Sequence, residues 1–235
     1  VELAGNIPVM AGIGSLRTQD VLRNAEAMQK TGVSAVLLAP VSYHHLSEDE
    51  VYSLYQQVTA ELSVPLCVYE NPGVTNFSFS DDLYYRVTRL PQVAAIKIPG
   101  MPFATEQGVE RLAQLRNLVP ETVAIGVSGD KFGATGMAAG CDLWLSVLGG
   151  LFPNTVKRLI EKAQSTQAES ALQPSEHLNG LWELFVRNKG GMRVMATAAH
   201  IMGLSEGDCL PAPLSLLNAE DRAILAGLLK QLQLD

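Results

Sequence analysis

One lysine in this sequence stands where nucleophilic chemistry is possible. Lys97 lies near the end of the apolar run Val93–Ile98, directly before a proline and a glycine. Burial disfavours the charged form of a lysine, so an amine at the end of a buried strand can be neutral and attack a ketone. The product is an iminium ion, which withdraws electrons from the neighbouring carbon. The alternative is a lysine that leaves its strand for solvent, and position alone favours that alternative.

A tyrosine at the end of the preceding apolar run strengthens the chemical interpretation. Tyr69 ends Leu66–Tyr69 and is followed by Glu70-Asn71-Pro72-Gly73, a typical turn sequence. Neighbouring parallel strands bring their carboxyl ends together, so we expect Tyr69 near Lys97. A phenol in that place can relay protons to and from substrate oxygens. Taken alone, Tyr69 would be read as a residue that caps a core strand.

The elements that must position these two residues alternate along the chain. Short apolar runs predict strands, and they are listed here in order: Ile7–Ala11, Ala35–Ala39, Leu66–Tyr69, Val93–Ile98, Val123–Val127 and Leu143–Val147. Segments of helical period separate them or follow them: Thr18–Lys30, Ser47–Leu62, Ser80–Arg89, Thr105–Leu118, Lys131–Ala139 and Pro153–Ala163. Short strands that alternate with helices indicate a parallel sheet.

The pattern corresponds to six βα units followed by helices alone. A complete (β/α)8 barrel has eight units and about 250 residues. Three further helices are expected near the carboxyl end: Ser175–Arg187, Gly191–Met202 and Asn218–Gln233. We therefore predict an α/β fold of the TIM (β/α)8 barrel type, with a barrel portion over residues 1–166 and a helical extension over 167–235. A doubly wound sheet is the structural alternative.

Composition excludes several classes of protein. The 235 residues are 47% hydrophobic and 17% charged, and the net charge is −7 with no basic cluster, which argues against nucleic acid as a partner. The longest apolar runs are too short to cross a membrane. The three cysteines have no metal-binding or disulfide spacing, so a cytoplasmic location is expected.

Five segments, taken together, resemble the dihydrodipicolinate synthase / N-acetylneuraminate lyase family. The first is Tyr-x-x-Pro at Tyr69–Pro72, with Lys97 twenty-eight residues after the tyrosine. The others occur in the family's order: Pro8–Ser15, Pro40–Tyr43, Ser128–Asp130 and Leu145–Val147. Each motif is weak alone, but their joint order and spacing are specific and cover nearly the whole chain.

The resemblance implies a class I aldolase or lyase that needs no cofactor and no metal. Lys97 would form a Schiff base with pyruvate or a related 2-oxo acid, and Tyr69 would relay protons. Tyr43 matches a tyrosine that enters the neighbouring subunit's site in tetrameric members, which implies a homo-oligomer, either a dimer or a tetramer. Other implied contacts with the 2-oxo acid or the aldehyde involve Gly129, Leu145 and Thr75.

The chain departs from the family's pattern in three places. It begins at what resembles the third strand, so the first two βα units are expected to have no counterpart. Val74 stands where dihydrodipicolinate synthases carry an arginine that grips a carboxylate, and Glu70 replaces the usual asparagine, a change expected at the pocket rim. Two alternatives therefore stay open: a non-catalytic paralogue that binds a 2-oxo acid, and a phosphate-binding barrel enzyme.

Overall fold

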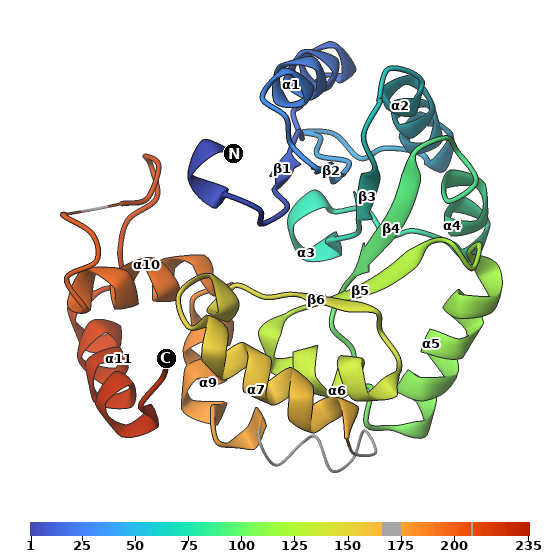
Figure 1. The fold of residues 1–235 in the computed structure, drawn as a ribbon. Helices are drawn as coiled ribbons and strands as arrows, with labels where there is room; N and C mark the ends of the chain where they lie inside the picture. The colour runs from blue at the N-terminus through green and yellow to red at the C-terminus, as the bar shows by residue number, and fades with distance from the viewer. Residues whose placement is uncertain (166–174, 208) are drawn as a thin grey trace. The chain divides into compact units, whose positions relative to one another are not determined.

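A parallel sheet forms the framework of this protein. The computed structural model describes residues 1–165, 175–207 and 209–235. Within them, six strands lie in the sequential order β1-β2-β3-β4-β5-β6 (Figure 1). They are β1 (Met10–Gly12), β2 (Ala35–Leu38), β3 (Leu66–Tyr69), β4 (Val93–Ile98), β5 (Ala124–Ser128) and β6 (Leu143–Leu145). Pairing from β1 to β5 is parallel throughout. The bounds of β3 and β4 are those predicted from the sequence.

The strand order decides between the two predicted architectures. A doubly wound sheet reverses its order part-way across, whereas a (β/α) barrel places each new strand beside the previous one. The sequential order observed here is that of the barrel. The barrel-type prediction with six βα units is therefore confirmed, and the doubly wound alternative is wrong.

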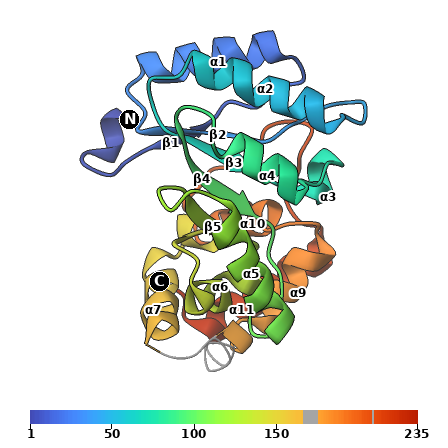
Figure 2. The same cartoon turned by 90° about the vertical axis from the view of Figure 1, so that its right-hand side faces the viewer.

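Helices connect the strands and cover one side of the sheet. Figures 1 and 2 show α1 (Thr18–Lys30), α2 (Glu48–Ala60) and α4 (Asp81–Val87) on the same side of the strands that they join. The next connection carries α5 (Glu106–Leu118). Each of these helices lies within a predicted segment. The short turn α3 (Pro72–Thr75) was expected only as a turn.

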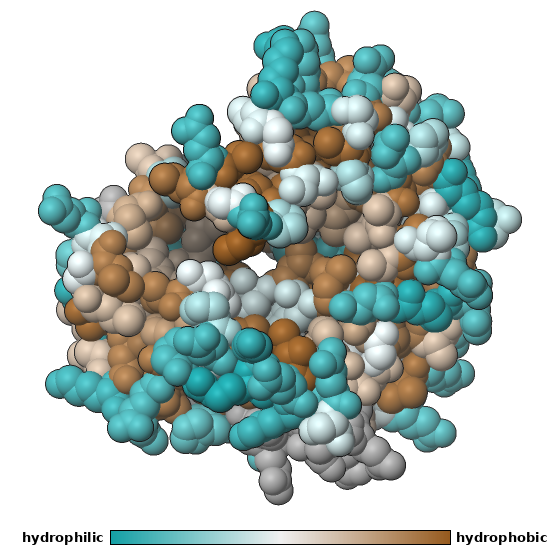
Figure 3. Space-filling view, viewed as in Figure 1, coloured by the Kyte–Doolittle hydropathy of each residue, from teal (hydrophilic) through white to brown (hydrophobic). Residues whose placement is uncertain are grey.

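Helix α1 illustrates why these segments are helical. Its Val21 and Ala25 are buried, while Arg23, Glu26 and Lys30 are exposed, as expected of a helix with one apolar face. The outer surface of α1 is correspondingly hydrophilic at the top of Figure 3. Helix α2 begins with a capping box, in which Ser47 and Glu50 exchange hydrogen bonds with each other's backbone amides. This cap ends the loop that carries Tyr43.

The two faces of the sheet differ in character. One row of side chains across four neighbouring strands is 0% exposed and lies under the helices: Leu38, Val68, Ile96 and Ile125. The Tyr55 hydroxyl of α2 donates a hydrogen bond to the Leu38 carbonyl at 2.8 Å. Because successive side chains of a strand point to opposite faces, Tyr69 and Lys97 project from the other face.

The described chain divides into two compact units. The first comprises residues 1–99, 110–127 and 141–143, and the second comprises residues 100–109, 128–140 and the described part of 144–235. The second unit contains α6 (Gly133–Ala139), α7 (Pro153–Gln164), α9 (Asn179–Arg187), α10 (Met192–Ile201) and α11 (Ala219–Leu232). Its core includes Phe152, Leu181, Trp182, Val194 and Leu225.

Three predictions about the second unit need comment. The expected helix Lys131–Ala139 is present as α6, which begins two residues later, after a 3-10 turn over Asp130–Phe132. The predicted domain boundary at residue 166 falls on residues 166–174, outside the described part of the chain, and stays a prediction. Helix α9 begins four residues after the predicted start.

The helices described in the structure are too short or too polar to cross a membrane. The three cysteines are free thiols, with Cys67 and Cys141 buried and Cys209 exposed.

Candidate active site

The structure brings Tyr69 and Lys97 into direct contact. They are register partners at the carboxyl ends of β3 and β4. The Lys97 Nζ lies over the Tyr69 ring, 3.5 Å from its centroid, where the electron-rich face of the ring attracts a cation. The ladder continues one residue further, since the Glu70 amide donates a hydrogen bond to the Lys97 carbonyl at 3.0 Å. The amine and the phenol are therefore held together by backbone pairing rather than by flexible loops.

Small or buried groups surround this pair on the sheet. Gly126 of β5 is the register partner of Lys97 and presents no side chain. Cys67 lies one step below Tyr69 on the same face and pairs with Ala95. Burial raises the pKa of the Cys67 thiol to about 12, although the nearby Lys97 charge acts in the opposite direction. Cys67 is therefore a neutral thiol beneath the pair.

Asn71 is a partner of Tyr69 that the sequence alone did not reveal. Its side-chain Nδ2 donates a hydrogen bond to the Tyr69 hydroxyl oxygen at 2.8 Å. Asn71 also precedes the turn α3, where its carbonyl accepts bonds from the amides of Val74 and Thr75. The signal in the sequence was an asparagine in a turn, which most often bonds its own backbone.

Glu70 does not lie at the pocket rim, and that expectation is wrong. Its side chain is 8% exposed and points away from the face of Lys97. One carboxylate oxygen accepts the Phe79 amide at 2.9 Å, and the other accepts the Tyr84 hydroxyl. Burial first, and the Glu70 charge second, raise the pKa of Tyr84 well above its ordinary value, so this phenol keeps its proton and donates a hydrogen bond to Glu70. The buried carboxylate thus links the end of β3 to α4 through hydrogen bonds.

Thr75, which is expected to contact substrate, forms hydrogen bonds within the turn that follows Tyr69. It is 6% exposed. Its hydroxyl donates to the Asn71 carbonyl at 3.0 Å, and a longer contact of 3.4 Å reaches the Phe77 carbonyl. In the described structure this hydroxyl supports Asn71; a contact with substrate stays a prediction.

Two further residues of interest are on the surface of the first unit. Tyr43 is 89% exposed, and its ring meets the His44 ring edge-on at 5.1 Å between centroids. Val74 is 68% exposed on α3. Tyr69 is thus in contact with Lys97, whereas the ring contact of Tyr43 is with His44. A role for Tyr43 in a neighbouring subunit's site stays a prediction.

Gly129 and Leu145 belong to the second unit, and their share in a site with Lys97 also stays a prediction. Gly129 has a φ of 82°, a left-handed conformation that favours glycine. The next residue, Asp130, is 4% exposed and accepts hydrogen bonds from the Ser146 hydroxyl at 2.5 Å and the Leu148 amide at 3.1 Å. Asp130 therefore fixes the loop that follows Leu145, a role that the sequence did not indicate.

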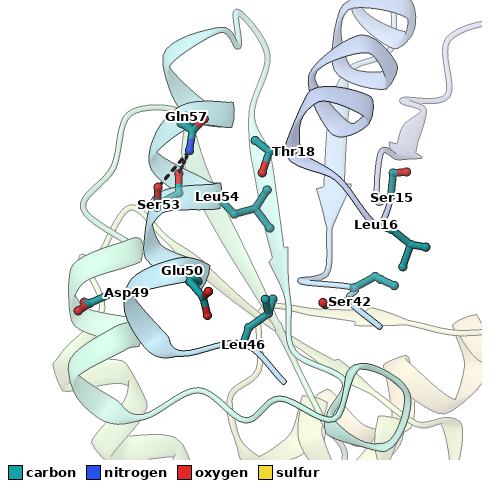
Figure 4. A pocket seen from close by; sticks show the side chains of 11 residues that line it. Ser15, Leu16, Thr18, Ser42, Leu46, Asp49, Glu50, Ser53, Leu54 and Gln57 are labelled. Carbon is teal, nitrogen blue, oxygen red and sulfur yellow. Dashed lines mark hydrogen bonds between the residues drawn. The ribbon is translucent and has the colours of Figure 1, made fainter. Parts of the chain in front are cut away.

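A pocket of about 430 Å³ lies elsewhere in the first unit, beside α2 (Figure 4). Polar groups from α1, α2 and the loops before them share its lining with a few leucines, and the polar ones are Ser15, Thr18, Ser42, Asp49, Glu50, Ser53 and Gln57. Gln57 donates two hydrogen bonds to Ser53, drawn in Figure 4. Neither Lys97 nor Tyr69 lines it. We place the candidate active site by its chemistry, at the Tyr69–Lys97 pair, rather than by this hollow.

Comparison with known proteins assigns the chain to a family. The sequence profile described as the Dihydrodipicolinate synthetase family matches residues 1–232. The chain belongs to the dihydrodipicolinate synthetase family. The resemblance inferred from the motifs is confirmed, and this family consists of Schiff-base-forming lyases that use pyruvate. No observation favours the non-catalytic or the phosphate-binding alternative.

Individual members of the family are similar over most of the chain. The 4-hydroxy-tetrahydrodipicolinate synthase of Rickettsia typhi is 27% identical over 224 residues, which are 95% of this chain and 73% of that protein. A crystal structure of dihydrodipicolinate synthase from Agrobacterium tumefaciens is 36% identical with a TM-score of 0.90, covering 98% of this chain and 76% of that one. A monomeric dihydrodipicolinate synthase variant shares the fold at 22% identity, with a TM-score of 0.86 over 100% of this chain and 77% of its own.

The different environments of the three thiols can be tested by labelling. In the native protein at mildly alkaline pH, we expect rapid reaction of the exposed Cys209 and slow reaction of Cys67 and Cys141. Burial raises the pKa of both buried thiols to about 12, so the reactive thiolate forms only as the pH approaches that value. Peptide mass spectrometry after timed labelling measures the three rates, and full reaction in denaturant is the control. Rapid labelling of Cys67 in the folded protein would contradict its place beneath Tyr69.

Proposed function

We propose that Lys97 is the Schiff-base nucleophile of this lyase and that Tyr69 is its proton relay. The observation that carries the proposal is the contact of the Lys97 amine with the Tyr69 ring at the ends of two paired strands. In parallel barrels, catalytic groups come from the carboxyl ends of strands. Family membership supplies the reaction class, and the pair supplies a nucleophile with an acid–base group beside it.

The chemistry follows from the two groups. The Lys97 amine forms a bond to the keto carbon of pyruvate while the carbonyl oxygen takes a proton, and loss of water then leaves an iminium ion. The iminium accepts the electron pair released when the methyl carbon loses a proton, giving an enamine that adds to an aldehyde carbon. In the cleavage direction, the carbon–carbon bond breaks and its electron pair enters the iminium instead. Water finally adds to the iminium and frees Lys97.

Tyr69 would carry the protons in these steps. Its hydroxyl can donate to the departing oxygen of the carbinolamine and take the proton back when water returns. Because the ring is in contact with Lys97, the phenol needs no large movement to reach atoms bound to that amine. Gly129 and Leu145 would contribute to the surroundings of the bound acid, as they are expected to do in the family.

Assembly and location are part of the same proposal. An exposed Tyr43 is available to a neighbouring copy, which supports a dimer or a tetramer; the monomeric dihydrodipicolinate synthase variant is a reason to measure the state. Free cysteines without a disulfide among the described residues support a cytoplasmic location.

We predict that borohydride traps pyruvate on Lys97. Incubation with pyruvate and borohydride should add one reduced pyruvate to the peptide that contains Lys97, as seen by mass spectrometry. Lys97→Ala should abolish both the adduct and turnover while the circular dichroism spectrum is unchanged, whereas Lys30→Ala, at an exposed lysine paired with Glu26, should behave like the parent protein. Normal turnover by a folded Lys97→Ala protein would rule out a Schiff base on Lys97.

We predict that Tyr69→Phe slows turnover by roughly 10²–10⁴-fold, the usual scale for a lost acid–base group. The ring that faces Lys97 is kept, so trapping of pyruvate at equilibrium should still occur. Steady-state rates and the final extent of borohydride labelling measure the two effects. Tyr85→Phe, at a half-exposed tyrosine of α4 that stacks on Arg89, is the matched control. An unchanged rate in Tyr69→Phe would remove Tyr69 from the proton relay.

The second substrate is the open part of the reaction, and Val74 bears on it. Valine offers no charge-assisted contact to a carboxylate, unlike the arginine that the family's synthases place there. We therefore expect release of pyruvate from 2-oxo sugar acids to exceed formation of a dihydrodipicolinate-type product. A coupled assay for pyruvate, run beside an assay for the cyclic product, measures both. Faster formation of the cyclic product would show that position 74 does not select the substrate.

A further inference from the structure

We infer that Asn71 is a positioning residue that directs the Tyr69 proton toward the substrate. The inference rests on the proposed roles of Lys97 and Tyr69. Asn71 Nδ2 donates to the Tyr69 hydroxyl oxygen at 2.8 Å. An oxygen that already accepts this bond points its own hydrogen elsewhere, because the hydroxyl has one hydrogen and separate lone pairs. The phenol hydrogen then lies on the side of the oxygen that faces away from Asn71, where it is free to be donated to a bound acid.

Hydrogen bonds fix the backbone of Asn71, which helps to orient its side chain toward Tyr69. Its carbonyl accepts three hydrogen bonds: from the Val74 amide at 3.0 Å, from the Thr75 amide at 2.9 Å and from the Thr75 hydroxyl at 3.0 Å. The turn α3 is therefore closed onto Asn71. A side chain on a fixed backbone loses less conformational entropy when it bonds Tyr69 than one on a mobile loop.

Glu70 anchors the same segment on the side away from the substrate. Its amide bonds the Lys97 carbonyl, while its carboxylate accepts the Phe79 amide and the Tyr84 hydroxyl. The segment from residue 70 to residue 79 is thus bonded to β4 and α4 at Glu70, and its far end at Phe79 is bonded back to Glu70. Asn71 lies between these ties and beside Tyr69. These contacts hold the backbone at Asn71 in the position from which its side chain bonds Tyr69.

The test uses a reaction that needs no second substrate. Formation of the enamine exchanges the methyl hydrogens of pyruvate for deuterium in D₂O, and proton NMR measures the rate. Asn71→Leu keeps the approximate size of the side chain but removes the donor. We expect exchange to slow by about 2- to 13-fold, which corresponds to the usual worth of about 0.5–1.5 kcal/mol for one hydrogen bond. The KM for pyruvate should change less than kcat, because the hydrogen bond that is removed is the one to Tyr69, the proposed proton relay.

The variant Asn71→Asp tests whether Asn71 orients the Tyr69 hydroxyl hydrogen or only supports the local structure. An ionised carboxylate can only accept, so it would turn the Tyr69 hydrogen away from the substrate and slow exchange more than leucine does. When the introduced carboxyl becomes protonated at lower pH, it regains a donor. The rate relative to the parent protein should therefore rise as the pH falls through the titration of that carboxyl. Asn117→Leu and Asn117→Asp, at an exposed asparagine of α5, are the matched controls.

The outcomes are distinguishable. Exchange and Lys97 trapping that are absent from the parent protein would defeat the proposed function itself. A parent protein that exchanges, with Asn71→Asp equally fast at neutral pH, would show that Asn71 accepts from Tyr69 and would overturn the inference. Leucine and aspartate variants that are equally slow at every pH would reduce Asn71 to a structural support and would also overturn it. A rise in the relative exchange rate of Asn71→Asp as the pH falls, absent from Asn71→Leu, would establish that Asn71 orients the Tyr69 hydroxyl.

Discussion

The parallel pairing of β3 with β4 is the constraint on which the site depends. It makes Tyr69 and Lys97 register partners and lets the chain continue for one more ladder bond, from Glu70 to the Lys97 carbonyl. A slip of one residue in either strand would turn one of the two side chains to the helix-covered face, where no substrate could reach it. The buried row that includes Val68 and Ile96 opposes such a slip, because it would expose apolar side chains.

A buried carboxylate, that of Glu70, fixes the chain segment that follows Tyr69. A carboxylate is costly to bury without partners, and that of Glu70 accepts two hydrogen bonds, from the Phe79 backbone amide and the Tyr84 hydroxyl. Because those partners come from a different part of the chain, the carboxylate specifies one path for the loop between β3 and α4. Asn71 and the turn α3 follow that path. The substitution of asparagine by Glu70 thus changes the support of the site rather than its lining.

Much of the framework could be predicted from local patterns. The bounds of α1, β3 and β4 follow from apolar periodicity, and the cap at Ser47 follows from side chains three residues apart. These signals are local, since a helix or strand satisfies its backbone and its apolar face over a few residues. The candidate pair was predicted because the ends of neighbouring parallel strands must meet. The side-chain contacts of Glu70 and Asp130 were missed because their partners lie in other segments of the chain.

The sequence by itself determined that the chain alternates strands with helices, that Tyr69 and Lys97 end consecutive strands, and that its motifs are those of one lyase family. Only the tertiary structure decided the sequential strand order, the direction in which Glu70 points, and the bond from Asn71 to Tyr69. The physical reason is that periodicity and turn propensity act within a segment. The partner of a polar side chain depends instead on which strands pair and in which register, and that choice is made by burial across the whole sheet.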